Sequence, residues 1–216
     1  MTEAPYHEVP KDNPVILPPH ASFVWRQDPI RFAISLARYK FVARMLEVSY
    51  KILEIGCADG FGTELVARGG GYLTAVDVDQ SFIDAAQRLA SSNVNFYRHD
   101  MLMSPFSRDE FDAFYALDVL EHISPNDEEQ FLHNAVLSLK DWGVGIVGVP
   151  SQESQVYASD ISKLRHVNCK TKNQLWCTMR NHFHNVFIFS MNDEVVHTGF
   201  GALAHYRFAL CTGPIK

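Results

Sequence analysis

The sequence has few cysteines and no spacing that would pair them. Only four occur in 216 residues, and no two of them have the Cys-x-x-Cys spacing of zinc or redox sites. We therefore expect free thiols in a reducing compartment. The four are Cys57, Cys169, Cys177 and Cys211.

Long apolar runs are also missing. No stretch approaches the roughly 18 consecutive apolar residues that a membrane-spanning helix needs. Residues 1–19 are polar and rich in proline, and they lack the apolar core of a signal peptide. These absences predict a cytoplasmic protein with no membrane partner.

The sequence has no excess of basic residues. Lys and Arg number 19 against 25 Asp and Glu, which gives a net charge of -6. A domain that holds nucleic acid by its phosphates is usually basic, so nucleic acid is not an expected partner. The composition, 47% hydrophobic and 20% charged, is that of an ordinary globular protein.

Proline is concentrated at the start of the chain, where the first 29 residues hold six of the ten. Because proline removes a backbone donor and disfavours helix, residues 1–28 are predicted to be an extended arm that Phe23 and Trp25 could anchor. Residues 29–216 are predicted to form one domain.

From residue 29 onward, apolar periodicity predicts helices and strands that take turns. Helices are expected at 29–47, 63–68, 81–89 and 127–139, and strands at 51–55, 72–76, 94–97, 111–116 and 144–149. Such alternation is typical of βαβ units and a parallel sheet. Beyond it we expect a polar loop over 151–171, a helix over 172–181, and strands over 186–190 and 204–211.

A glycine-rich turn follows the first predicted strand, with Gly56, Gly60 and Gly62 within seven residues. Glycine allows positive φ and close approach of a ligand to the backbone. The carboxyl end of the first strand is where open α/β sheets bind ligands. A tight turn without a ligand would use glycine in the same way.

An acid stands where a ribose would need one. Asp77 ends the second predicted strand, 21 residues beyond Gly56, and a carboxylate there can accept from both ribose hydroxyls. Asp79 is the alternative, although its expected role is to cap the helix that begins near Ser81.

The glycine turn fails the dinucleotide fingerprint, because Ala58 and Phe61 occupy two of its three glycine places. A nicotinamide-dependent dehydrogenase is therefore a weaker alternative. The pattern Glu54-x-Gly56-x-Ala58-x-Gly60 instead resembles motif I of the class I S-adenosylmethionine-dependent methyltransferases, with alanine for the middle glycine. The resemblance covers residues 51–150 well and the remainder loosely.

Two further segments carry the same resemblance. Residues 97–101 resemble the family's third-strand segment, where Asp100 would meet the adenine amino group, and residues 111–123 resemble its fourth-strand block. The resemblance implies a doubly wound, Rossmann-like α/β fold with a seven-stranded, mostly parallel sheet whose last strand is antiparallel. It implies S-adenosylmethionine as cofactor, and the expected binding residues are Glu54, Gly56, Ala58, Asp59, Gly60, Asp77, Val78, Asp100, Met101 and Leu117.

Asp118, Glu121 and His122 follow the fourth predicted strand at i, i+3 and i+4, positions that share a helical face. They could hold a divalent metal or supply a general base. The stretch resembles the Glu-x-x-Glu-His site of the ubiquinone-biosynthesis O-methyltransferases, which would imply a metal near the acceptor. The same pattern also occurs in family members without a known metal requirement, so no metal is predicted.

The segment from Arg165 to Asn168 resembles the family's stretch at the open side of the cofactor, which makes His166 a candidate on the acceptor side. His122 and His166 are the predicted catalytic residues. His197 lies in a predicted hairpin connection and is a further candidate to reach the site.

Together these features predict in-line methyl transfer from S-adenosylmethionine to oxygen or nitrogen of a small-molecule acceptor, a sugar or a secondary metabolite. The alternatives are a non-catalytic S-adenosylmethionine-binding protein and a protein or RNA methyltransferase. The protein is expected to be a monomer or a homodimer.

Overall fold

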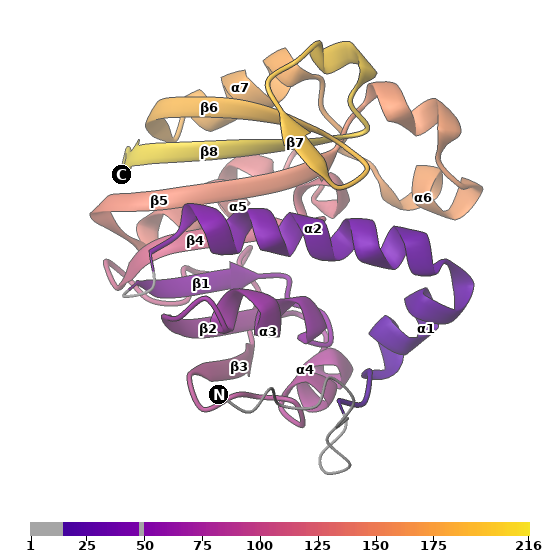
Figure 1. The fold of residues 1–216 in the computed structure, drawn as a ribbon. Coiled ribbons are helices and arrows are strands. Elements are labelled where there is room, and N and C mark those ends of the chain that lie inside the picture. Colours follow the sequence, from indigo (N-terminus) through magenta and orange to yellow (C-terminus); the bar gives the residue numbers. More distant parts are fainter. Residues whose placement is uncertain (1–14, 48–49) are drawn as a thin grey trace, which may run out of the picture.

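The computed structural model describes residues 15–47 and 50–216. Their eight strands form one sheet in the order β3-β2-β1-β4-β5-β8-β6-β7 (Figure 1). The bounds are β1 Lys51–Ile55, β2 Tyr72–Asp77, β3 Val94–Arg98, β4 Phe111–Leu117, β5 Leu139–Pro150, β6 Phe183–Asn192, β7 Val195–His197 and β8 Tyr206–Pro214.

The sheet confirms the predicted topology and adds one strand. β1 to β5 pair in parallel, and β8 runs antiparallel between β5 and β6. The eighth strand is β7, which pairs with the end of β6 where the sequence predicted only a hairpin connection. β5 is also longer than predicted. Leu139, expected to end a helix, and residues 140–143, for which no element was predicted, belong to the strand.

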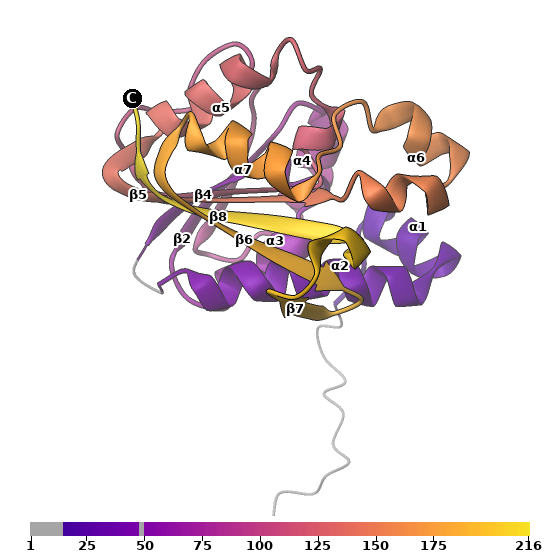
Figure 2. The same ribbon diagram turned by 90° about the horizontal axis from the view of Figure 1, so that it is seen from above.

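Helices cover both faces of the sheet. α2 (Pro29–Met45), α3 (Phe61–Ala67) and α4 (Gln80–Ala86) pack with one core cluster, and α5 (Glu128–Leu137) and α7 (Lys172–Arg180) pack with the other. α2 and α7 lie on opposite sides in Figure 2. β4 is almost wholly buried because it is covered on both faces.

Two segments predicted to be irregular contain helices. α1 (Pro19–Gln27) lies within the predicted extended arm. The prediction of an extended conformation is therefore wrong over these residues. Pro18 and Pro19 occupy the N-cap and first helical positions, where the backbone N–H has no intrahelical partner and proline is tolerated. Residues 1–14 of the predicted arm lie outside the described residues.

The predicted polar loop over 151–171 holds a 3-10 turn, η2 (Glu153–Tyr157), and a short helix, α6 (Asp160–Arg165). Ser159 caps α6 by accepting a hydrogen bond from the Ser162 amide. Two more 3-10 turns, η1 (Leu120–His122) and η3 (Gly201–Leu203), follow β4 and precede β8. α1 and α6 both lie at the right-hand edge in Figure 1.

In the described part of the chain, no helix combines the length and the apolar character needed to cross a membrane.

Candidate functional site

The strand register brings the predicted site residues to one edge of the sheet. Ile55 lies level with Val76 on β2 and with Ala116 on β4. The residue that follows each of these three therefore lies at the same edge of the sheet. These residues are Gly56, Asp77 and Leu117. The order of strands reverses between β1 and β4, so this is the edge and the place where doubly wound sheets bind ligands.

The turn after β1 is built from left-handed residues. Gly56 has φ +80°, and a Cβ there would lie 2.3 Å from Cγ2 of Val119, so only glycine fits. Gly60, with φ +76°, precedes α3. Ala58 has φ 47° although it is not a glycine, which makes it the strained member of the turn.

Asp77 joins this turn to the end of β2. Its Oδ2 accepts from the Ala58 amide at 3.0 Å and its Oδ1 from the Asp79 amide at 2.9 Å. A carboxylate has about four acceptor positions, so each oxygen can accept one more donor. Asp79 instead caps α4, accepting from the Ser81 amide at 2.8 Å, as predicted for it.

Asp59, a predicted cofactor residue, is already engaged within the protein. Its side chain is 3% exposed, and Oδ2 accepts from the Ala21 amide in the first turn of α1 at 2.8 Å. His20 in the same turn packs edge-on against Phe82 of α4. Asp59 thus anchors α1 over the glycine turn, and its predicted contact with the cofactor stays a prediction.

Glu54 is also turned inward. It is 1% exposed, beneath the turn. Burial raises the pKa of Glu54 to about 7, and the nearby hydroxyls of Thr63, Tyr115 and Tyr39 oppose that rise. This carboxyl lies among side chains of α2, α3 and β4, and its predicted contact with a ligand stays a prediction.

The ends of β3 and β4 supply one acid and two apolar side chains. The Oδ1 of Asp100 accepts from the Leu102 amide at 2.9 Å, and the acid is half-buried. Met101 and Leu117 are buried at 3% and 4% exposure. Val78, the remaining predicted residue, is exposed beside Asp77.

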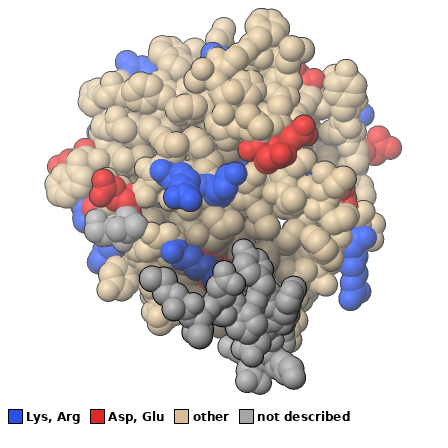
Figure 3. Space-filling model, viewed as in Figure 1, with Lys and Arg blue, Asp and Glu red and all other residues tan. Residues whose placement is uncertain are grey.

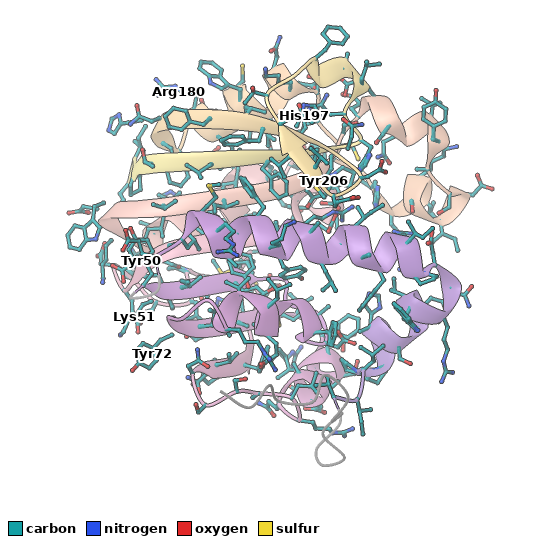
Figure 4. The ribbon with its side chains drawn as sticks, viewed as in Figure 1. Tyr50, Lys51, Tyr72, Arg180, His197 and Tyr206 are labelled. Carbon is teal, nitrogen blue, oxygen red and sulfur yellow. The ribbon has the colours of Figure 1, made fainter. Side chains whose placement is uncertain are left out.

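Asp118 is held by a residue that sequence reasoning missed. Nη1 of Arg38 on α2 lies 2.5 Å from its Oδ2, and the guanidinium stacks over Tyr206 of β8 at 4.0 Å from the ring centroid. Figure 4 labels Tyr206 at this end of β8. Eighty residues separate Arg38 from Asp118, and no local pattern in the sequence connects them.

Glu121, His122 and His166 form the one group of possible metal ligands found among the described residues, with one ligand atom of each within 4.8 Å of the others. His166 thus takes the place that the sequence gave to Asp118. Glu121 is 1% exposed, and neither carboxylate oxygen has a hydrogen-bond donor within the described chain. Burial, and then the charge of Asp118, raise the pKa of Glu121 well above its usual value.

The two predicted catalytic histidines lie together. Their ring centroids are 5.1 Å apart in an edge-to-face arrangement. Burial, and then the nearby His122, lower the pKa of His166, so its neutral ring is favoured. His197, labelled in Figure 4, lies on β7. It is instead bonded within its own hairpin, with Nε2 at 2.8 Å from Oδ1 of Asn192.

Charged side chains are sparse on the face that carries α2. Lys and Arg appear there in small separate groups, with no continuous basic surface among the described residues drawn (Figure 3).

The sequence resembles known methyltransferases over the part of the chain that forms this edge. Residues 52–143 match a family model described as a methyltransferase domain. The ubiquinone biosynthesis O-methyltransferase of Coxiella burnetii (strain Dugway 5J108-111) is 27% identical over 114 residues, covering 51% of this chain and 48% of that protein. The chain thus spans about half the length of the curated relatives it matches.

Solved structures share the fold at low sequence identity. A chain from the complex between the Haloferax volcanii Trm112 methyltransferase activator and a methyltransferase has a TM-score of 0.72 at 14% identity, covering 90% of this chain and 96% of that one. A TehB-like SAM-dependent methyltransferase from Corynebacterium glutamicum has a TM-score of 0.67 at 17% identity, covering 90% and 98%. At these identities the likeness speaks for the fold alone.

Three observations point to the same kind of protein: the matched domain, the strand order, and the contact between the glycine turn and Asp77. Residues 52–143 are thus similar to a methyltransferase domain, and the fold is shared with solved S-adenosylmethionine-dependent methyltransferases.

Proposed function

We propose that this protein transfers a methyl group from S-adenosylmethionine to oxygen or nitrogen of a small-molecule acceptor. One observation carries the proposal above all others. The Asp77 carboxylate lies 3.0 Å from the Ala58 amide, so the acid and the glycine turn meet at the point where strand order reverses.

The residues at this edge fit the cofactor. Asp77 retains acceptor capacity for the two ribose hydroxyls. Asp100 would accept from the adenine amino group, while Met101 and Leu117 would border the ring. The turn from Gly56 to Gly60 would hold the methionine part.

When bound, the cofactor supplies an electrophilic methyl group that the acceptor takes by in-line displacement. The protein's larger contribution is to hold the acceptor in place, since alignment can lower a barrier by about 7–11 kcal/mol. A hydroxyl acceptor also loses a proton, and neutral His166 or His122 would take it as general base.

A small acceptor is favoured over a nucleic acid. The net charge of -6 and the scattered basic residues of the α2 face offer little to a phosphate backbone. The name of the Coxiella burnetii relative, an O-methyltransferase, favours oxygen as the methylated atom.

The test has two stages. Isothermal titration of the full chain should show binding of S-adenosylmethionine and none of NAD; the reverse result would overturn the proposal. Pools of hydroxylated and amino small molecules should then release S-adenosylhomocysteine. Binding without release from any acceptor would identify a non-catalytic protein, and release only with protein or RNA would refute the acceptor class.

A further inference from the structure

Gln155 of η2 stands between the end of β5 and one of the two site histidines. Its Nε2 lies 3.2 Å from the carbonyl oxygen of Ser151, to which it donates. Its Oε1 lies 3.0 Å from Nδ1 of His166. One carboxamide therefore links the sheet to the imidazole.

These two contacts determine which nitrogen of the ring carries the proton. A backbone carbonyl can only accept, so the amide end of Gln155 faces Ser151 and the oxygen end faces His166. Because Oε1 also only accepts, Nδ1 of His166 is the donor. In the neutral ring the free lone pair is then at Nε2.

The anchor of this link is rigid. Ser151 is fully buried, its amide donates to the His205 carbonyl at 2.9 Å, and its Oγ donates to the Ala204 carbonyl at 2.6 Å. It also forms a parallel bridge with Lys170. The position of Gln155 is thus set by the sheet and by the segment that enters β8.

His122 is held in the same way by the backbone. Its Nδ1 lies 3.1 Å from the carbonyl oxygen of Arg165, which can only accept, so the His122 lone pair is also at Nε2. Both rings are therefore in the same tautomer beside the buried Glu121. Only the His166 contact depends on a side chain, which makes it the one that substitution can test.

We propose that Gln155 is a positioning residue for methyl transfer: it holds His166 as the Nδ1–H tautomer and leaves the Nε2 lone pair free to take the acceptor's proton. The catalytic part rests on the proposed function, whereas the tautomer can be measured without turnover.

The test compares two substitutions in the full chain. Gln155→Met has a similar length and no acceptor oxygen. Gln155→Glu keeps an acceptor oxygen for His166 but loses the amide that donates to Ser151. Nitrogen-15 NMR of the histidine rings should show the Nδ1–H form of His166 in the unmodified protein and in Gln155→Glu, and a mixture of tautomers in Gln155→Met. S-adenosylmethionine affinity should be the same in all three.

Turnover should separate positioning from simple structural support. With the acceptor from the screen, Gln155→Met should lower kcat at least about tenfold with little change in KM for the cofactor, and Gln155→Glu should restore most of it. An Nε2–H form in the unmodified protein, an unchanged tautomer in Gln155→Met, or equal kcat for that variant would each overturn the proposal. Loss of cofactor binding by the unmodified protein would instead refute the proposed function and leave the NMR result to decide the role of Gln155.

Discussion

Replacing Asp77 by alanine is the most informative perturbation of the cofactor site. The carboxylate already accepts from two backbone amides, at 3.0 Å and 2.9 Å, and we expect two ribose hydroxyls to complete its bonding. A hydrogen bond to a charged group contributes about 1.5–3 kcal/mol. Since about 1.4 kcal/mol is tenfold in affinity, the loss of even one such bond should weaken S-adenosylmethionine binding at least tenfold.

Isothermal titration measures this loss, and a second ligand shows its cause. S-adenosylhomocysteine and its 2′-deoxy analogue should differ in affinity for the unmodified protein and much less for Asp77→Ala. Asp77→Asn, which keeps one acceptor oxygen, controls for the bond to the Ala58 amide, and thermal unfolding checks that the turn survives. Unchanged affinity in Asp77→Ala, or undiminished discrimination against the deoxy analogue, would refute the ribose role.

Three further outcomes follow from the site. His166→Ala should spare cofactor affinity and lower turnover by about 100-fold, the usual contribution of a general base; turnover at the normal rate would remove it from the reaction. Ala58→Gly should raise the free energy of unfolding by about 1 kcal/mol in denaturant titration, because φ 47° strains alanine; a loss of stability would contradict that strain. The folded-state pKa of Glu54, about 7, lies above its ordinary 4.5. As the pH rises between those values, the carboxyl ionises in the unfolded chain first, so its contribution to the free energy of unfolding should fall by about 1.4 kcal/mol per pH unit. Glu54→Gln should lack that slope when unfolding is compared at pH 5, 6 and 7. An identical slope in the two proteins would contradict the raised pKa of Glu54.

The parallel sheet was predictable because its strands are buried on both faces and read as short apolar runs. β4, with six of its seven residues buried, is the clearest case. α1 was missed because the prolines that suggested an extended arm lie where a helix tolerates them, at its start. β7 is three residues long and exists only through its pairing with β6, so it leaves no periodic pattern.

In the candidate site too, features set by local sequence were predictable and those set by tertiary contacts were not. The proximity of Gly56 and Asp77 was predictable because their spacing along the chain follows from one βαβ unit. Arg38 and Gln155 act across tertiary contacts, with Asp118 and His166 respectively, and nothing local in the sequence marks either pair. The burial of Glu54 and Asp59 was not predictable either, since a motif specifies residue types and not the direction in which a side chain faces.

The bond between Asp59 and the Ala21 amide limits how the protein can be shortened. Removing the residues before Pro29 would leave a carboxylate that is only 3% exposed without its donor, at a cost of about 1–3 kcal/mol. It would also remove the His20 ring from Phe82. A shortened protein should therefore keep α1, since removing it would loosen the glycine turn after β1.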